Sequence, residues 1–185
     1  TAFHNGLVMA TAYALPVSFL GWMFVGNIVP FFVNDVVATP LATQYTSIVF
    51  ISLVFSAYSF VFQGFYTGVE KTKIHMTVTI VSNLLNVYLN AGLIYGTEGV
   101  KVFLNDVAPG FSFLSYLWRW TEFPALGVKG AAISTVVASI WMAAHYTLYL
   151  FSKDIKDRFS VFSFSFDRTM MARQLRLALP LGIQE

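Results

Sequence analysis

The stretch that decides the fold is Ile74–Tyr95, IHMTVTIVSNLLNVYLNAGLIY, an apolar run without Asp, Glu, Lys or Arg. A helix of about 20 mostly apolar residues crosses the hydrocarbon core of a membrane, because each residue rises about 1.5 Å and the core is about 30 Å thick. Three further stretches have the same character, at about 7–33, 43–65 and 128–151. We therefore expect four membrane-spanning helices, with a fifth beginning in 175–185.

The composition of the whole chain supports this expectation. Of its 185 residues, 57% are hydrophobic and 11% are charged, whereas typical soluble domains have about 45–50% and about 25%. An aromatic content of 17% excludes a disordered chain, and the absence of cysteine excludes a disulfide scaffold. The predicted fold class is therefore all-α, a polytopic bundle of membrane helices.

The connections between the expected spans alternate in charge. Lys and Arg gather in 66–73 and 152–174, whereas 34–42 has neither and 97–127 has few for its length. Cytoplasmic loops of membrane proteins collect Lys and Arg. We therefore predict a multi-pass protein of the plasma (inner) membrane, with 66–73 and 152–174 cytoplasmic and 34–42 and 97–127 external.

The third connection contains an unusual aromatic insert. Its residues 100–120 read VKVFLNDVAPGFSFLSYLWRW, and the polar and turn-forming residues at 105–110 prevent a membrane crossing. The second half mixes Phe, Tyr and Trp with Arg119, and aromatic residues of this kind favour the membrane–water interface. We expect an external hairpin or helix at that interface, with a lid packed over the bundle as the alternative.

Polar residues inside a span are costly unless they face protein or water, so their helical phase is informative. In 74–95, four of them recur at spacings of four, three and four residues and share one helix face: Thr79, Asn83, Asn86 and Asn90. Asn86 and Asn90 lie one turn apart and can present two carbonyl oxygens to a cation. Hydrogen bonding between helices, at about 0.6 to 2 kcal/mol per contact, is the alternative interpretation.

The second span also has a polar face, which is composed of Ser52, Ser56, Ser59 and Gln63. These side chains either line a cavity, together with Thr79 and Asn83, or allow close helix packing.

Small residues form two neighbouring stripes on the fourth span. One stripe is Gly130, Ser134 and Ala138, and the other is Gly127, Ala131, Thr135 and Ser139. Small residues repeated every four positions allow helix backbones to approach closely. If the third and fourth spans are neighbours, Thr135 can offer its hydroxyl oxygen to the same site as Asn86 and Asn90.

The sequence has no features of an enzyme. It contains no His/Cys cluster with metal-ligand spacing, no nucleophile elbow and no phosphate-binding loop. We predict no catalytic residue, no cofactor and no metal beyond a coupling ion.

An ordered set of motifs gives the chain a family resemblance. The set is FQGFYTGVEKTK at 62–73, SNLLNVYLN at 82–90, LIYG at 93–96, LGVKGAAIST at 126–135 and RLALPLGIQ at 176–184. Together they resemble the MATE (multidrug and toxic compound extrusion) transporter family. The resemblance implies a twelve-span protein with two lobes. This chain would supply spans three to six of the first lobe, the linker between the lobes at 152–174, and the start of span seven at 175–185.

The resemblance also implies a function and a site. Family members export organic cations by alternating access in exchange for Na⁺ or H⁺. Many have a first-lobe cation site that uses an Asp of span one, an amide or carboxylate pair in span five and a Thr of span six. Asn86, Asn90 and Thr135 stand at the matching positions. The implied partners are membrane lipid, organic cations and the remaining spans, and no nucleic acid is expected.

Two other functions stay open on the sequence alone. A lipid or lipid-linked polysaccharide flippase of the same superfamily would hold pyrophosphate with basic residues, yet the expected spans contain only Lys129. In a membrane scaffold that transports nothing, helix packing would explain the Ser, Asn and Gly stripes.

Overall fold

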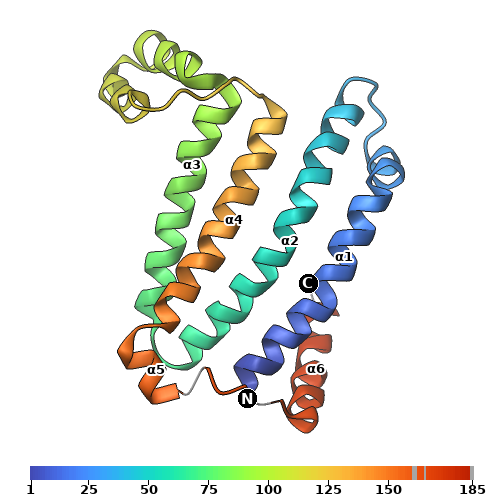
Figure 1. Ribbon diagram of the computed structural model, residues 1–185. Helices are drawn as coiled ribbons and strands as arrows, with labels where there is room; N and C mark the ends of the chain where they lie inside the picture. Colours follow the sequence, from blue (N-terminus) through green and yellow to red (C-terminus); the bar gives the residue numbers. More distant parts are fainter. Residues whose placement is uncertain (160–161, 165, 184–185) are drawn as a thin grey trace.

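The computed structural model describes residues 1–159, 162–164 and 166–183 and contains eight helical segments in that part of the chain (Figure 1). Four helices are long and apolar enough to cross a membrane: α1 (Ala2–Phe32), α2 (Ala38–Gly68), α3 (Thr72–Val102) and α4 (Val128–Leu150). The shorter segments are a π-helix η1 (Phe103–Val107), a 3₁₀ helix η2 (Pro109–Trp118), α5 (Lys153–Phe159) and α6 (Arg168–Ile183). The predicted all-α membrane bundle is confirmed.

The four spans stand in a row in the order α3, α4, α2, α1, and each packs mainly on its neighbours in that row. Spans that follow one another in the sequence run in opposite directions (Figure 1). The turn between α2 and α3 therefore lies at the same end of the bundle as α5. The connection between α1 and α2 and the long loop 97–127 lie at the other end. The connections that are rich in Lys and Arg therefore lie at one end of the bundle, and those that are poor in them lie at the other, as the predicted topology requires.

The helices extend beyond the expected spans. α1 begins at Ala2, α2 covers 38–68 and α3 continues to Val102. Apolar residues alone set the expected limits, whereas a helix continues through polar residues where its ends reach water. The segment 152–174, which was expected to be a linker, contains α5 and the first half of α6. Of the expected fifth span, residues 184–185 lie outside the described part of the chain.

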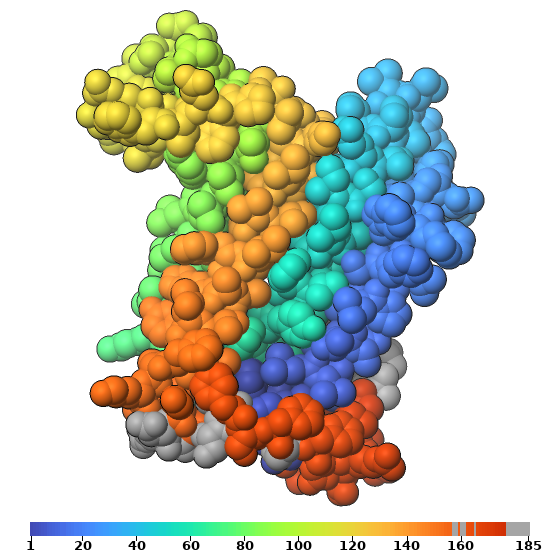
Figure 2. Space-filling model, viewed as in Figure 1, coloured from blue at the N-terminus to red at the C-terminus, as the bar shows by residue number. Residues whose placement is uncertain are grey.

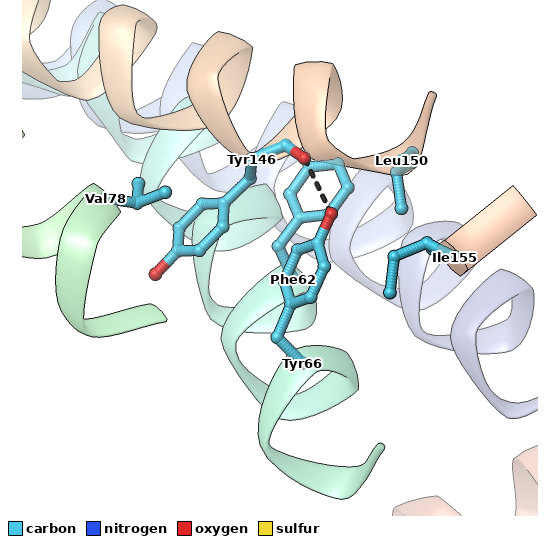
Figure 3. Close-up of a cluster of buried hydrophobic side chains, with 6 residues drawn as sticks. All are labelled: Phe62, Tyr66, Val78, Tyr146, Leu150 and Ile155. Carbon is cyan, nitrogen blue, oxygen red and sulfur yellow. Dashed lines mark hydrogen bonds between the residues drawn. The ribbon is translucent and has the colours of Figure 1, made fainter. Parts of the chain in front are cut away.

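A core of buried side chains joins the helices at the end of the bundle that carries α5. It consists of Phe62, Tyr66, Val78, Tyr146, Leu150 and Ile155 (Figure 3). The ring of Tyr146 stacks on those of Phe62 and Tyr66, with centroids 5.7 Å away in both pairs. Because these residues come from α2, α3, α4 and α5, this one cluster fixes four elements relative to one another.

The backbones of α3 and α4 touch at Gly130. A Cβ atom at this position would lie 2.1 Å from the carbonyl oxygen of Leu93, so only glycine allows the approach. Just before α4, the amide groups of Leu126 and Gly127 donate to the carbonyl oxygens of Leu93 and Ile94, at 2.9 and 3.1 Å. Gly130, Ser134 and Ala138 are all buried, as expected of a packing stripe.

The start of α6 is attached to α1 through Asn5. This side chain is fully buried and forms two hydrogen bonds with the backbone of Asp167. Its Nδ2 donates to the carbonyl oxygen at 2.8 Å, and its Oδ1 accepts from the amide nitrogen at 3.2 Å. α6 consequently lies beside the first turns of α1, as the space-filling view also shows (Figure 2).

Candidate functional site

The two asparagines predicted as cation ligands form one hydrogen-bonded group with α4. Asn90 donates from Nδ2 to Oδ1 of Asn86, 2.8 Å away. The hydroxyl of Ser134 on α4 has two acceptors for its one proton, Oδ1 of Asn90 at 2.5 Å and the carbonyl oxygen of Ala131 at 2.8 Å, of which Asn90 Oδ1 is the nearer. Both asparagines are half-buried and Ser134 is fully buried. We call the line of contact between α3 and α4 the seam. Two amide oxygens and a hydroxyl oxygen therefore lie close together in this seam.

These oxygen atoms keep part of their capacity to bind a ligand. An amide oxygen has two lone pairs, and each of the hydrogen bonds above uses one. One lone pair on Asn86 Oδ1 and one on Asn90 Oδ1 thus remain after the amide–amide and amide–hydroxyl contacts form. Hard cations bind such oxygen atoms in proteins. The group is chemically suited to a cation, and it also fits the alternative of bonding between helices.

Thr135, the third predicted ligand, lies on the neighbouring helix as expected. Its hydroxyl donates to the carbonyl oxygen of Ala131 in its own helix, at 2.9 Å. The bond across the seam comes instead from Ser134, which the sequence analysis assigned to packing. Thr135 keeps the lone pairs of its oxygen and is half-buried.

The other predicted polar residues divide between two surroundings. Asn83 is exposed on α3, and Ser52 is buried with its hydroxyl donating to the carbonyl oxygen of Val49 at 2.7 Å. The remaining four side chains line one cleft of about 400 Å³ between α2, α3 and α4: Ser56, Ser59, Gln63 and Thr79. The expected cavity-lining face is thus only partly assembled around a common space.

The cleft also contains residues that the sequence analysis did not assign to a site. They are Phe60, His75, Ser139, Met142 and Tyr146. Nδ1 of His75 lies 2.6 Å from the hydroxyl oxygen of Tyr146, and Thr79 Oγ1 lies 3.4 Å from the same Nδ1. No sequence signal marks this pairing, since a single histidine near a helix start has no periodicity.

The lining of the cleft is more apolar than polar, and it contains no Asp, Glu, Lys or Arg. It combines hydroxyl groups, one amide, one imidazole and aromatic rings. Within the described residues, no three His, Asp or Glu side chains come close enough together to hold a metal ion. A cleft of this kind binds a ligand through dipoles and ring faces rather than through an ion pair.

The position of the cleft along the bundle separates it from the asparagine group. Thr79 lies two helical turns before Asn86 on α3, which corresponds to about 10 Å along the helix axis. Both features lie against α4. The helices α3 and α4 thus carry a candidate cation site near mid-span and, together with α2, border a ligand-sized cleft closer to the α5 end.

Four apolar helices that cross the membrane in alternating directions define the class, a multi-pass helical membrane protein. Residues 1–91, which form α1, α2 and most of α3, match the MatE family model. This match supports a fragment of a MATE family transporter, and the MATE family is a family of transporters rather than of enzymes. No curated protein and no solved structure matches the chain.

Proposed function

We propose that this chain forms part of a cation-coupled antiporter that exports organic cations or amphipathic drugs across the plasma (inner) membrane. Na⁺ or H⁺ is the coupling ion. The observation that carries the proposal is the hydrogen-bonded group Asn86–Asn90–Ser134 in the seam between α3 and α4. It supplies neutral oxygen ligands inside a membrane span, beside a cleft of ligand size.

The charge of the spans favours a cationic substrate over an anionic one. Within the described spans, the Lys and Arg residues are Lys73, Lys101 and Lys129, and all lie near helix ends. The cleft itself is lined by hydroxyl, amide and aromatic groups. Aromatic faces attract organic cations, whereas a pyrophosphate group needs cationic partners. This argues against a flippase for pyrophosphate-linked lipids.

Coupling follows from differential binding to two conformations. An ion gradient drives export when the ion and the drug each favour a different state of the protein. A cation held by Asn86, Asn90 and Thr135 would tighten the seam between α3 and α4. The same seam forms one wall of the cleft, so occupation of one site can change the shape of the other.

The test is efflux of ethidium from cells that express the complete coding sequence, under imposed Na⁺ or H⁺ gradients. Asn90→Ala removes the central amide, and Asn83→Ala removes an exposed amide from the same helix as a matched control. We expect gradient-driven export that Asn90→Ala abolishes and Asn83→Ala preserves at equal expression.

Two results would count against this function. Export that continues unchanged in Asn90→Ala would make the asparagine group a packing feature. A lack of export for ethidium and for other organic cations tried in the same way would favour a flippase or a scaffold.

A further inference from the structure

The loop 97–127 is built as a separate folded unit at one end of α3. Gly96 adopts φ +73° and ψ 161°, which breaks the helix. Beyond it the chain turns sideways, away from α2 and α1 (Figure 1). Thr97 then holds the returning segment 119–127, because its hydroxyl donates to the carbonyl oxygen of Thr121 at 2.8 Å and accepts from the amide nitrogen of Phe123 at 2.9 Å.

One side of this unit packs on α3. Leu104 and Trp118 are buried together with Val100, and the ring of Tyr88 stacks on Trp118 with centroids 5.0 Å apart. Among the four described spans, α3 is the helix against which η1 and η2 lie. The unit therefore does not cover the row of helices, which argues against the lid that the sequence left open.

The opposite side is apolar and uncovered. A 3₁₀ helix has three residues per turn, so Ser112, Ser115 and Trp118 form one stripe of η2, and this stripe is the most buried. The other two stripes and the residue after Arg119 present large exposed side chains. We call this the aromatic surface: Phe111, Phe113, Tyr116, Leu117 and Trp120, each at least 56% exposed.

Four of the five charged groups of the loop take a different position, and the fifth, Asp106, is exposed on η1. Glu98, Lys101, Arg119 and Glu122 line a polar hollow of about 430 Å³ between the end of α3 and the returning segment 119–127. Arg119 also lies over the rings of Tyr116 and Trp120, at 5.2 and 5.5 Å from their centroids. The loop is thus amphipathic, and Arg119 marks the border between its polar and aromatic sides.

We propose that the aromatic surface is inserted in the phospholipid interface at this end of the bundle, with Arg119 at the level of the lipid phosphates. The unit projects sideways from the end of a span (Figure 2). The end of a membrane-spanning helix lies at the level of the lipid headgroups. The helix α3, from which the unit projects, also exposes large apolar side chains, such as Leu84, Val87 and Tyr95. Tyr and Trp are enriched at this depth, and arginine reaches phosphate while its stem stays in apolar surroundings.

The occupant is lipid rather than a second protein, because exposed aromatic rings bordered by Arg119 match the boundary between hydrocarbon and lipid phosphate. The inference does not depend on transport. It assigns the loop an anchoring contact that holds the outer end of α3 against sideways displacement.

Spin labelling tests the proposal directly, since residues 1–185 contain no cysteine. In the complete coding sequence, any cysteine elsewhere is first replaced by serine. Nitroxide labels are then attached to Trp120→Cys and, separately, to Phe113→Cys, in phospholipid nanodiscs. Collision rates with oxygen, which concentrates in lipid, and with a water-soluble nickel chelate give the depth of each label.

Two sites calibrate the measurement. Leu84→Cys is exposed in mid-span on α3, and Glu98→Cys is exposed on the polar side of the loop. We expect the labels at 113 and 120 to fall between these two in depth, with more oxygen collisions than at 98. Nickel collisions as frequent as at 98 would place the surface in water and overturn the proposal. An immobilised label shielded from both reagents would also overturn it, because a protein would then cover the surface.

Discussion

The hydroxyl of Tyr66 on α2 donates a hydrogen bond to the backbone carbonyl oxygen of Tyr146 on α4, 2.8 Å away (Figure 3). The same Tyr146 meets Nδ1 of His75 on α3 through its own hydroxyl, at 2.6 Å. One residue of α4, which also lines the cleft, therefore forms hydrogen bonds with both α2 and α3. Several measurable consequences depend on this arrangement.

Tyr66→Phe is expected to lower the free energy of unfolding by about 0.5–1.5 kcal/mol, the usual net value of one hydrogen bond. The ring still fills its buried position, so the stack on Tyr146 persists. Tyr95→Phe is the matched control, because Tyr95 is exposed at 63%. Thermal unfolding of the complete protein in detergent measures both variants. Equal unfolding temperatures for Tyr66→Phe and the unchanged protein would show that the hydrogen bond of the Tyr66 hydroxyl makes no net contribution to stability.

Gly130→Ala is expected to be severely destabilising. The new methyl group would meet the backbone of Leu93 at 2.1 Å, and a backbone cannot move aside as a flexible side chain does. Overpacking of this kind costs about 1–3 kcal/mol or more. Gly64→Ala on α2 is the control, since no atom lies within 4 Å of its added Cβ. Folded yield by size-exclusion chromatography should fall for the first variant alone.

Ser134→Ala removes the hydroxyl that bonds to Asn90 across the seam, while the smaller side chain still fills most of the space of the serine. Polar contacts between membrane helices average about 0.6 kcal/mol and reach about 1.7 kcal/mol. We expect a small loss of stability together with weaker cation dependence of ethidium efflux. Thr147→Val is the control, because this exposed hydroxyl bonds only within α4 in the described contacts. A variant with unchanged ion dependence would exclude Ser134 from the cation site.

The short helix α5 offers a contrast between charge and packing. Lys71 forms an ion pair with Asp154 at the bundle end, and both side chains are partly exposed. Surface pairs contribute about 0–1 kcal/mol, so Asp154→Ala should change stability little. The adjacent Ile155 is 1% exposed, and Ile155→Ala should cost about 2–5 kcal/mol. Chemical denaturation in mixed micelles would rank the two, and the reverse order would contradict this account.

The sequence predicted the number and approximate limits of the spans, because length and apolarity determine which segments cross a membrane. The order of the helices in the row was not predictable. Lipid is as apolar as the outer side chains of a helix, so there is little hydrophobic force between spans. Close contacts of individual residues then decide the neighbours, such as Gly130 against Leu93. Such contacts depend on backbone positions that a periodic pattern does not contain.

The candidate site shows the same limit at the level of residues. Helical phase correctly brought Asn86 and Asn90 together, because residues four apart share a face. Which stripe of α4 would meet them depended on the rotation of that helix. Ser134 and Thr135 differ by one position, or about 100° around the axis. The contact at Gly130 sets this rotation, and Ser134 belongs to the same stripe as Gly130. The position of Gly130 in the sequence was therefore the feature from which the rotation of α4 could have been predicted.

The hydrogen bonds of Thr97 have a consequence for how the loop 97–127 can vary. They hold the two ends of residues 98–120 together independently of what lies between. Loop-closure entropy grows slowly with length, by about 0.6 kcal/mol for each doubling. An epitope tag or a shortened linker near Gly110 should therefore leave α3 and α4 in register. Evolution has the same freedom at this point, so the loop is where close relatives should differ most in length.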